Sequence, residues 1–512
     1  MKKQFFLFSI LLPLLAMAQK KNTPPFFAKT ISEEDLKKHL YIIASKEMGG
    51  RDTPSPGLEK AADYIENHFK MLGLVPGNNG SYRQHYPLYK DSMISSSFTV
   101  NGKKFELKED FIPSTANYAA GMRFNEVVFA GFGIVDGDRD DYAGLDVTGR
   151  LVIIIDGIPN GFKATPGQGG GAASPFSKMR TAQKKGAAAL LIVNGGYPRK
   201  TFNTTSSWSL NSFKAVQSPL VFNISENTAA AIMGTDAKGI LENMKTQPLA
   251  SKTYKADVDL NYFKETKTTN AANVMGLLEG SDKKDEYVLL TAHYDHIGTR
   301  SDTIINYGAD DDGSGTVTIL ELAEAFTKAK AAGKGPRRSI LFMTVSGEEH
   351  GLWGSAYYAN HPVYPLEKTS VDLNIDMIGR IGNEYNNDKD SANYVYLIGD
   401  DKLSSDLATI SDMVNKENTG LKLDRKYNDP KDPNRFYYRS DHYNFAEKGV
   451  PIIFYFNGVH KDYHRPTDTP DKINYPLMAK RGQLVFYTAW EMANRDAMMK
   501  RDIKLEVPPR GF

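Results

Sequence analysis

Histidine, aspartate and glutamate residues form five separate clusters in the second half of this 512-residue chain. The clusters are HYDH at 293–296, DDD at 310–312, EEH at 348–350, the aspartate of NID at 374–376, and YHR at 463–465. Imidazole and carboxylate groups are the ligands with which proteins hold zinc and similar divalent cations. Three consecutive aspartates repel one another unless a cation or another partner offsets their charge. Together the clusters predict a metal centre.

Two of the clusters offer more than metal ligands. In the pair Glu348-Glu349, one carboxylate can bind a metal while its neighbour takes a proton. His293 is followed two residues later by Asp295, which can accept from the imidazole and fix its tautomer. Each pattern alone is weak evidence. An HxD usually occurs by chance at the surface, and in the aspartate cluster Asp312 would also suit a helix N-terminus. Their occurrence in one series, each after an expected strand, favours a shared site.

The clusters fall where apolar runs, which we expect to be buried strands, come to an end. These runs are residues 274–278, 287–292, 340–345, 371–375, 394–398 and 452–456. Helical patterns occupy residues 317–332 and 477–494. This alternation predicts an α/β fold around a mostly parallel sheet, with ligands at the carboxyl ends of the strands.

The rest of the chain predicts a second module. A capping box at Thr30 to Glu33 predicts a helix to about residue 44, and apolar spacing predicts another over residues 58–72. Between residues 115 and 260, short apolar strands alternate with glycine-rich loops, and no charged cluster suggests catalysis. We therefore expect a signal peptide at 1–18, parts of one domain at 19–114 and 261–512, and a small β-rich inserted domain at 115–260.

Composition and the first residues limit where the protein is expected to act and which partners it can have. A positive start, an apolar run at 5–15 and Ala16-Met17-Ala18 predict a cleavable signal peptide and a periplasmic or extracellular protein. No later stretch suggests a membrane anchor. The net charge of +2 gives no footprint for nucleic acid. The chain has no cysteine, so imidazole and carboxylate must hold any metal.

In combination, these motifs resemble the co-catalytic di-zinc aminopeptidases, which are relatives of glutamate carboxypeptidase and glutaminyl cyclase. The matching segments are HYDHIG, GADDDGSG, SGEEHGLWGS, NIDMIGR, RSDHYNF and DYHRPTDT. The resemblance covers the helical lead from about residue 30 and nearly everything from residue 273 onward. It implies a three-layer α/β/α sandwich with a mixed, mostly parallel central sheet. The inserted domain, with its GFGI and AQKKGAAALLIV segments, resembles a protease-associated domain.

The resemblance also implies a ligand set for two zinc ions. Asp311 would bridge both ions, Glu349 and His464 would complete one site, and His293 and Asp376 would complete the other. Against four positive charges these ligands supply three negative ones, which favours a bridging hydroxide. The peptide bond between Asp311 and Asp312 would be cis.

Three further residues receive roles by the same resemblance. Glu348 would be the general base, and Asp295 would orient His293. Tyr437 would stabilise the oxyanion, with the adjacent Tyr438 as the alternative. His296 and His350, which flank the motifs, are expected to have structural roles. The aromatic residues of the segment 436–445 are candidates either for a substrate pocket or for the core.

The implied activity is removal of N-terminal residues from peptides that have a free N-terminus. Three alternatives remain open: a glutaminyl cyclase-like acyltransferase, a carboxypeptidase or dipeptidase of the same fold, and a non-catalytic binding module. The full aspartate cluster favours two metals over the single zinc of a cyclase. A binding module would be expected to lack Glu348 or a ligand, and none is missing.

Overall fold

The computed structural model describes residues 23–165, 171–211, 217–246, 249–301, 303–429 and 431–505, which form two compact units. The first unit comprises the described residues up to Tyr86 and from Asn270 onward, and the second comprises Pro87–Thr269. The expected signal peptide at 1–18 lies outside the described residues. No described helix is long and apolar enough to cross a membrane.

The second unit comprises Pro87–Thr269, whereas the inserted domain was expected at 115–260. The chain passes between the units within two long strands, β2 (Arg83–Val100) and β11 (Lys252–Leu278). A strand that continues through a boundary carries no linker composition to mark it. The change of texture near residue 115 therefore falls inside the second unit.

A mixed, mostly parallel sheet forms the centre of the first unit. The strand order is β18 (Lys422–Asp424), β17 (Tyr394–Ile398), β19 (Ile452–Phe456), β16 (Thr369–Ile375), β12 (Lys283–His293), β15 (Arg338–Val345) and the end of β11. The neighbours β19, β16, β12 and β15 are parallel, whereas β17 is antiparallel to β19 and β11 is antiparallel to β15. The predicted α/β fold is confirmed.

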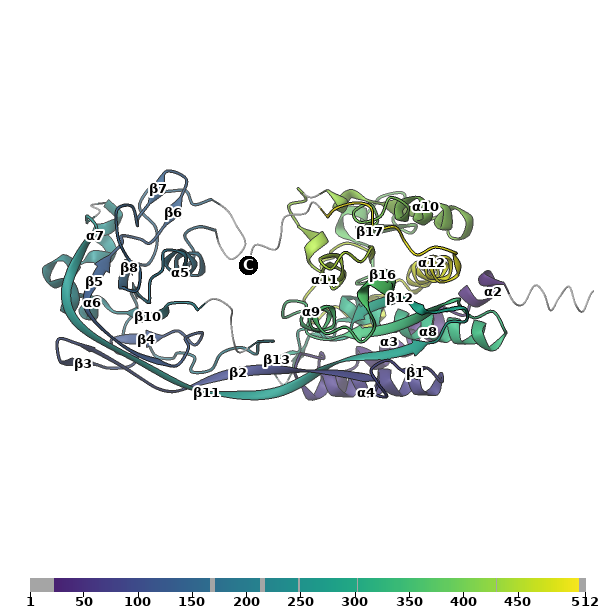
Figure 1. Cartoon of the computed structure of the whole chain (residues 1–512), viewed down its shortest axis with the longest axis horizontal. Helices are drawn as coiled ribbons and strands as arrows, with labels where there is room; N and C mark the ends of the chain where they lie inside the picture. Colours follow the sequence, from purple (N-terminus) through teal and green to yellow (C-terminus); the bar gives the residue numbers. More distant parts are fainter. Residues whose placement is uncertain are drawn as a thin grey trace, which may run out of the picture. The chain divides into compact units, whose positions relative to one another are not determined.

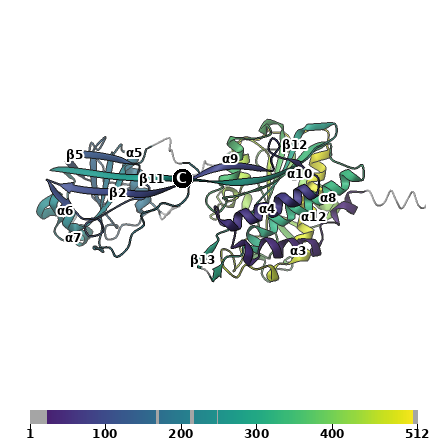
Figure 2. The ribbon, with the colours of Figure 1, turned by 90° about the horizontal axis from the view of Figure 1, so that it is seen from below.

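Helices cover both faces of this sheet (Figure 1). One group is formed by α3 (Glu33–Ile43), α4 (Pro56–Met71), α8 (Gly315–Ala331) and α12 (Tyr475–Asn494), with α2 (Pro24–Ala28) and α10 (Leu407–Asn418) against α12. Figure 2 shows α3 and α4 beside α8 and α12. The other group is α9 (Trp353–Asn360) and α11 (His442–Ala446), which contact each other.

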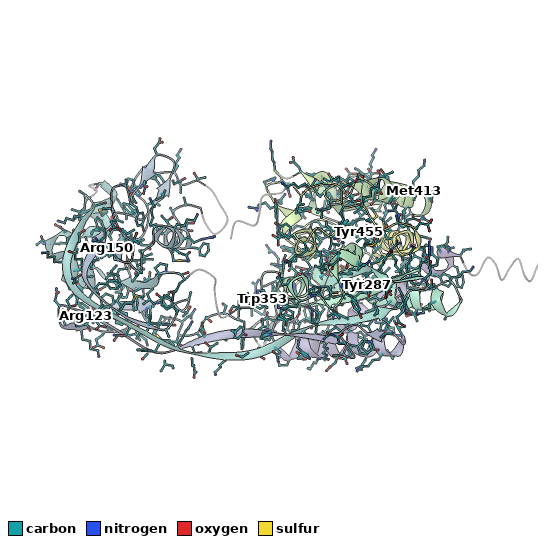
Figure 3. All side chains as sticks on the ribbon, in the orientation of Figure 1. Arg123, Arg150, Tyr287, Trp353, Met413 and Tyr455 are labelled. Atoms are coloured by element: carbon teal, nitrogen blue, oxygen red, sulfur yellow. The ribbon has the colours of Figure 1, made fainter. Side chains whose placement is uncertain are left out.

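Burial explains why the strand runs could be recognised in the sequence. Every residue of β15, β16, β17 and β19 is buried, as expected of strands covered on both faces. Figure 3 shows the contrast between Tyr455 of β19, inside the unit, and Met413 of α10, at its surface. Their exposed fractions are 1% and 41%.

The start of α3 differs in detail from the expected capping box. The hydroxyl of Ser32 accepts from the backbone N–H of Asp35 at 3.1 Å, so Ser32 is the N-cap. Thr30 instead donates its hydroxyl to the carbonyl of Phe27 at 2.8 Å. Both residues are good N-caps by type, and the register of the buried face selects Ser32.

The second unit has its own core and a run of strands that begins on β11, the strand it shares with the first unit. Its strands are the first part of β11, then β5 (Ala120–Phe129), β8 (Leu151–Ile155), β9 (Ala189–Val193), β10 (Leu220–Ile224) and β4 (Phe111–Pro113). The strands β5 to β10 in this order are parallel, and α5 (Pro175–Lys184), α6 (Glu226–Met233) and α7 (Ile240–Thr246) accompany them. Phe98, Phe111 and Phe222 pack together in its core. No residue of this unit belongs to the clusters that the sequence singled out.

Candidate metal centre

The parallel strands bring three of the five clusters to one edge of the sheet. His293 is the last residue of β12, and it pairs in register with Val345, the last residue of β15. On the other side of β12, β16 ends at Ile375, directly before Asp376. Because parallel strands end at the same edge, the two glutamates that follow β15 meet His293 and Asp376 there.

The aspartate cluster and the late loop complete the group. Residues Ala309–Ser314 form an irregular turn before α8, and the peptide bond between Asp311 and Asp312 is cis, as the resemblance implied. His464 lies in a loop after β19 and has a positive φ of 56°. All five predicted ligands therefore come together.

The two carboxylate oxygens of Asp311 face two different histidines. Asp311 Oδ1 lies 3.4 Å from His293 Nε2, which is also 3.6 Å from Asp376 Oδ1. Asp311 Oδ2 lies 3.1 Å from His464 Nε2, which is also 3.0 Å from Glu349 Oε2. Asp311 thus joins two groups of ligands.

The distances at His293 fit zinc, and those at His464, 3.1 and 3.0 Å, are slightly shorter than the zinc range. Tetrahedral zinc with bonds of about 2.0–2.2 Å places neighbouring ligand atoms roughly 3.3–3.6 Å apart. Among the described residues, His293 Nε2 is a buried ring nitrogen without a hydrogen-bond partner, whereas Asp311 Oδ2 and Glu349 Oε1 lie beside imidazole nitrogens. A buried nitrogen is normally paired, and zinc would bind it together with the neighbouring carboxylate oxygens.

Charge also favours a cation. Burial alone lowers the pKa of His464, but its hydrogen bonds with Asp311 and Glu349 raise that pKa to about 10. Burial raises the pKa of Asp376, and the neighbouring Asp311 adds to the effect. In the metal-free cluster, protons on the histidines therefore offset the carboxylates, and zinc would displace them.

By proximity, two further residues belong to the cluster. Asp312 groups with His293 and Asp376, and His296 groups with Asp311 and Glu349. Asp312 is already occupied, since its carboxylate accepts from the backbone N–H groups of His293, Gly315 and Met377 at 3.2, 2.9 and 3.0 Å. It holds the ends of β12 and β16 to the start of α8.

His296 stands closer to the centre than its expected structural role suggests. Its Nδ1 lies 2.7 Å from Glu349 Oε1 and 3.8 Å from Asp311 Oδ2, and the ring is fully buried. The sequence offered one signal for this, its position directly after HYD. His350 lies at the periphery, with Nε2 2.7 Å from Asp52 Oδ1.

Asp312→Ala is expected to destabilise the fold strongly. The change leaves three backbone N–H groups buried without an acceptor, at a cost of about 1–3 kcal/mol each. The free energy of unfolding, from denaturant titration in the presence of chelator, should fall by at least about 3 kcal/mol. Asp429→Ala removes an exposed carboxylate that accepts one backbone N–H, and serves as the control. Equal losses in the two variants would contradict this role of Asp312.

Glu348 is placed to handle a proton next to the ligands. Its Oε2 lies 3.9 Å from His293 Nε2, too far for a hydrogen bond, and its carboxylate lines the cavity beside Asp311 and Asp376. Burial raises the pKa of Glu348 well above its usual value, and Glu349 and Asp376 act in the same direction. The Asp295 carboxylate accepts from the Glu348 backbone N–H at 3.2 Å and lies 3.6 Å from His293 Nδ1.

The structure does not bring Tyr437 to the cluster. Its hydroxyl is buried with no hydrogen-bond partner among the described residues, and its ring lies against Gly399. Burial raises its pKa, with contributions from Tyr443 and Asp401 rather than from the clustered carboxylates. Within the short helical turn at Phe436–Tyr438, Phe436 lines the cavity at the cluster and Tyr437 does not. The expected placement of Tyr437 is corrected accordingly.

Tyr463 is the tyrosine that reaches the centre. It belongs to the inner cavity, a space of about 30 Å³ at the carboxylates, lined by Asp311, Glu348, Asp376, Met377, Phe436, Arg439, Phe454, Phe456, Val459 and Tyr463. Its ring stacks on His464, with centroids 3.9 Å apart. Burial raises its pKa, and Asp311 and Glu349 contribute to the shift. The sequence placed Tyr463 next to a ligand but offered no reason to prefer it over Tyr437.

Two buried residues that the sequence did not indicate hold the aspartate turn. The Arg51 guanidinium donates to the carbonyls of Ile43, Tyr294, Tyr307 and Gly308 at 2.8–2.9 Å. Asp468 Oδ2 accepts from the backbone N–H groups of Asp310 and Asp311 at 2.9 and 3.2 Å. Such long-range contacts leave no local pattern, which is why sequence reasoning missed them.

The site's geometry coincides with a match to a known family. Residues 273–489 match the model of peptidase family M28. This M28 region contains all five predicted ligands and Glu348. This match agrees with the resemblance inferred from the motifs.

The individual relatives of this chain are distant in sequence. "Probable zinc metalloprotease" of Pyrenophora tritici-repentis is 28% identical over 269 residues, which cover 44% of this chain and 52% of the relative. "Aminopeptidase YwaD" of Bacillus subtilis is 24% identical over 338 residues, covering 64% of this chain and 61% of that protein. The chain therefore spans little more than half the length of these curated relatives.

The similarity to a solved structure extends beyond residues 273–489. The structure of an aminopeptidase from Aneurinibacillus sp. strain AM-1 superposes with a TM-score of 0.53 at 20% identity. The likeness covers 94% of this chain and 99% of that one. At this identity it shows a shared fold.

Proposed function

We propose that this chain is a zinc-dependent aminopeptidase with two zinc ions per chain. One observation carries the proposal: the two oxygens of Asp311 face His293 and His464, from two different clusters, at 3.4 and 3.1 Å. Asp376 would complete the site at His293, and Glu349 would complete the site at His464. The M28 match and the similarity to aminopeptidase YwaD of Bacillus subtilis support the same activity.

The chain's own residues have distinct tasks in this reaction. Bound zinc supplies a Lewis acid that polarises the scissile carbonyl and lowers the pKa of water. The Glu348 carboxylate takes the proton of the attacking water and returns it to the leaving amine. The Tyr463 hydroxyl is placed to donate to the developing oxyanion, because its oxygen already accepts from Arg439 Nη2 at 3.2 Å.

The lining of the inner cavity is consistent with peptides that have a free N-terminus as substrates. The free α-amine of a substrate would lie at the metal centre beside Glu348 and Asp376, while Met377, Phe454 and Phe456 offer an apolar surface to the first side chain. We propose further that the chain is exported through residues 1–18. The inserted domain expected at 115–260, which resembles a protease-associated domain in sequence, would bind substrate or restrict access.

Metal removal tests the proposal. Chelation should abolish hydrolysis of aminoacyl-anilides, and zinc should restore it with about two ions bound per chain, as measured by elemental analysis. Release of ammonia from peptides with N-terminal glutamine, without release of amino acids, would favour the cyclase alternative. Release of C-terminal residues only would favour a carboxypeptidase. Full activity after complete removal of zinc would exclude the proposal.

A further inference from the structure

Next to the metal centre lies a second, larger cavity that the proposed reaction does not use. This outer cavity has a volume of about 350 Å³ and is lined by Gly382, Asn383, Glu384, Tyr396, Tyr427, Asn434, Phe436, Arg439, Gly458, Val459 and Tyr463. It shares Phe436, Arg439, Val459 and Tyr463 with the inner cavity. The four shared residues form a common wall between the reacting centre and the outer cavity.

Arg439 is the only charged member of this common wall. Its Nη2 donates to the Tyr463 hydroxyl at 3.2 Å, and its guanidinium lies 5.0 Å from the centroid of the Phe436 ring. These two contacts hold the side chain at the junction of the cavities. Within the described part of the chain, no carboxylate lies within ion-pair distance of Arg439. By contrast, Arg380 pairs with Asp462, and Arg425 pairs with Asp400.

An unpaired guanidinium in a cavity wall is suited to bind a carboxylate. Its planar fork donates two parallel N–H groups to the two oxygens, a geometry that matches a carboxylate. The outer cavity has little negative charge to repel an anionic ligand. Its one lining carboxylate, Glu384, is paired with Lys426, whose Nζ lies 2.7 Å from each carboxylate oxygen. Its polar groups include the amides of Asn383 and Asn434.

The length of a bound peptide favours a carboxylate close to the scissile bond as the group that Arg439 binds. Arg439 lines the same small cavity as Glu348 and Asp376. A peptide advances about 3.3–3.6 Å per residue. The group that meets Arg439 therefore belongs to the first two or three residues of a peptide whose amine lies at Glu348 and Asp376.

We propose that Arg439 binds a carboxylate of the substrate and that the outer cavity holds the residue that carries it. The inference rests on the proposed aminopeptidase function and adds a substrate class to it: short peptides with a free C-terminus, or peptides with an acidic side chain near the N-terminus. Both sources present the same chemical group to the guanidinium. Arg439 is thus a determinant of specificity rather than of the proton transfers.

Matched peptide pairs distinguish the two sources. Leu-Gly and its amide differ only in the C-terminal carboxylate. Leu-Asp-amide and Leu-Asn-amide differ only in an acidic second side chain, and Glu-Gly-amide and Gln-Gly-amide only in an acidic first one. For each pair, the ratio of kcat/KM is measured for the zinc-loaded wild type, Arg439→Gln, Arg439→Lys and the control Arg435→Gln. Arg435 lies in the same segment, over the ring of Tyr438, and lines neither cavity.

The ratio isolates carboxylate binding. Any effect of Arg439→Gln through Tyr463 or on folding is common to both members of a pair and cancels. The wild type should prefer the charged member of at least one pair by about tenfold, mostly through KM. Arg439→Gln should abolish this preference, Arg439→Lys should retain part of it, and Arg435→Gln should retain all of it. The pair that responds identifies the source of the carboxylate.

Two results would overturn the inference: no preference for a charged member in any pair, or a preference that survives Arg439→Gln. A binding experiment separates this failure from failure of the proposed function. Calorimetry with zinc-loaded Glu348→Gln compares the affinities of Leu-Gly, Leu-Asp-amide, Glu-Gly-amide and their uncharged partners without turnover, alone and combined with Arg439→Gln. Charge-dependent binding lost with Arg439 would uphold the inference even if the wild type hydrolysed no peptide.

Discussion

Glu348→Gln is expected to reduce kcat for peptide hydrolysis by about 10²- to 10⁴-fold, the usual contribution of a positioned proton-transfer group. The amide keeps the size of the side chain but can neither take the proton of the attacking water nor return it to the leaving amine. KM should change little, because the apolar surface of Met377, Phe454 and Phe456 remains. Steady-state kinetics with an aminoacyl-anilide measures both constants.

Zinc content separates this effect from loss of the metal. Glu348 is not one of the five proposed ligands, so Glu348→Gln should still bind about two zinc ions per chain. Glu349→Gln, one residue away, should instead lose zinc, since Glu349 Oε2 lies 3.0 Å from His464 Nε2 in the ligand group. Glu447→Gln, an exposed glutamate on the same unit, controls for the chemical change. A fully active Glu348→Gln enzyme would assign the base to another residue.

The buried strands of the first unit were the most predictable part of the fold. The expected strands at 394–398 and 452–456 agree residue by residue with β17 and β19, and those at 340–345 and 371–375 lie within β15 and β16. Central parallel strands are buried on both faces and read as continuous apolar runs. The passage of β2 and β11 between the units has no such signature, so the domain boundaries could not be read.

The ligands were predictable because their chemistry is local and their placement follows from topology. His293, Glu349 and Asp376 stand at the ends of adjacent parallel strands, where convergence is a consequence of the sheet. Tyr437 and Tyr463 show the limit of this reasoning. Both flank motif residues, and only the folded structure shows that Tyr463, and not Tyr437, lines the inner cavity.

Zinc is expected to raise the thermal midpoint of the wild-type protein by roughly 5–10 °C when its free concentration is about a hundred times the dissociation constant. At that ratio, binding to one site stabilises the folded state by about 2.7 kcal/mol, and 1 kcal/mol shifts the midpoint of a domain this large by about 2–4 °C. Asp311→Ala removes the ligand common to both sites, so its midpoint should respond to zinc only weakly. Thermal unfolding followed by circular dichroism, with chelator as the reference, measures both responses.

The comparison of the wild type with Asp311→Ala tests whether one aspartate is shared by both zinc sites, rather than zinc binding in general. Asp376→Asn alters only the site at His293 and should keep part of the zinc response, because Asp311, Glu349 and His464 remain. The metal-free form of this variant should not be destabilised at neutral pH. The folded-state pKa of Asp376 is raised by burial, so ionisation of this carboxyl costs stability as the pH rises above the pKa it has when unfolded, and the neutral amide avoids that cost. A full zinc response in Asp311→Ala would show that the two groups of ligands bind their metals independently, and would remove the observation on which the dinuclear proposal rests.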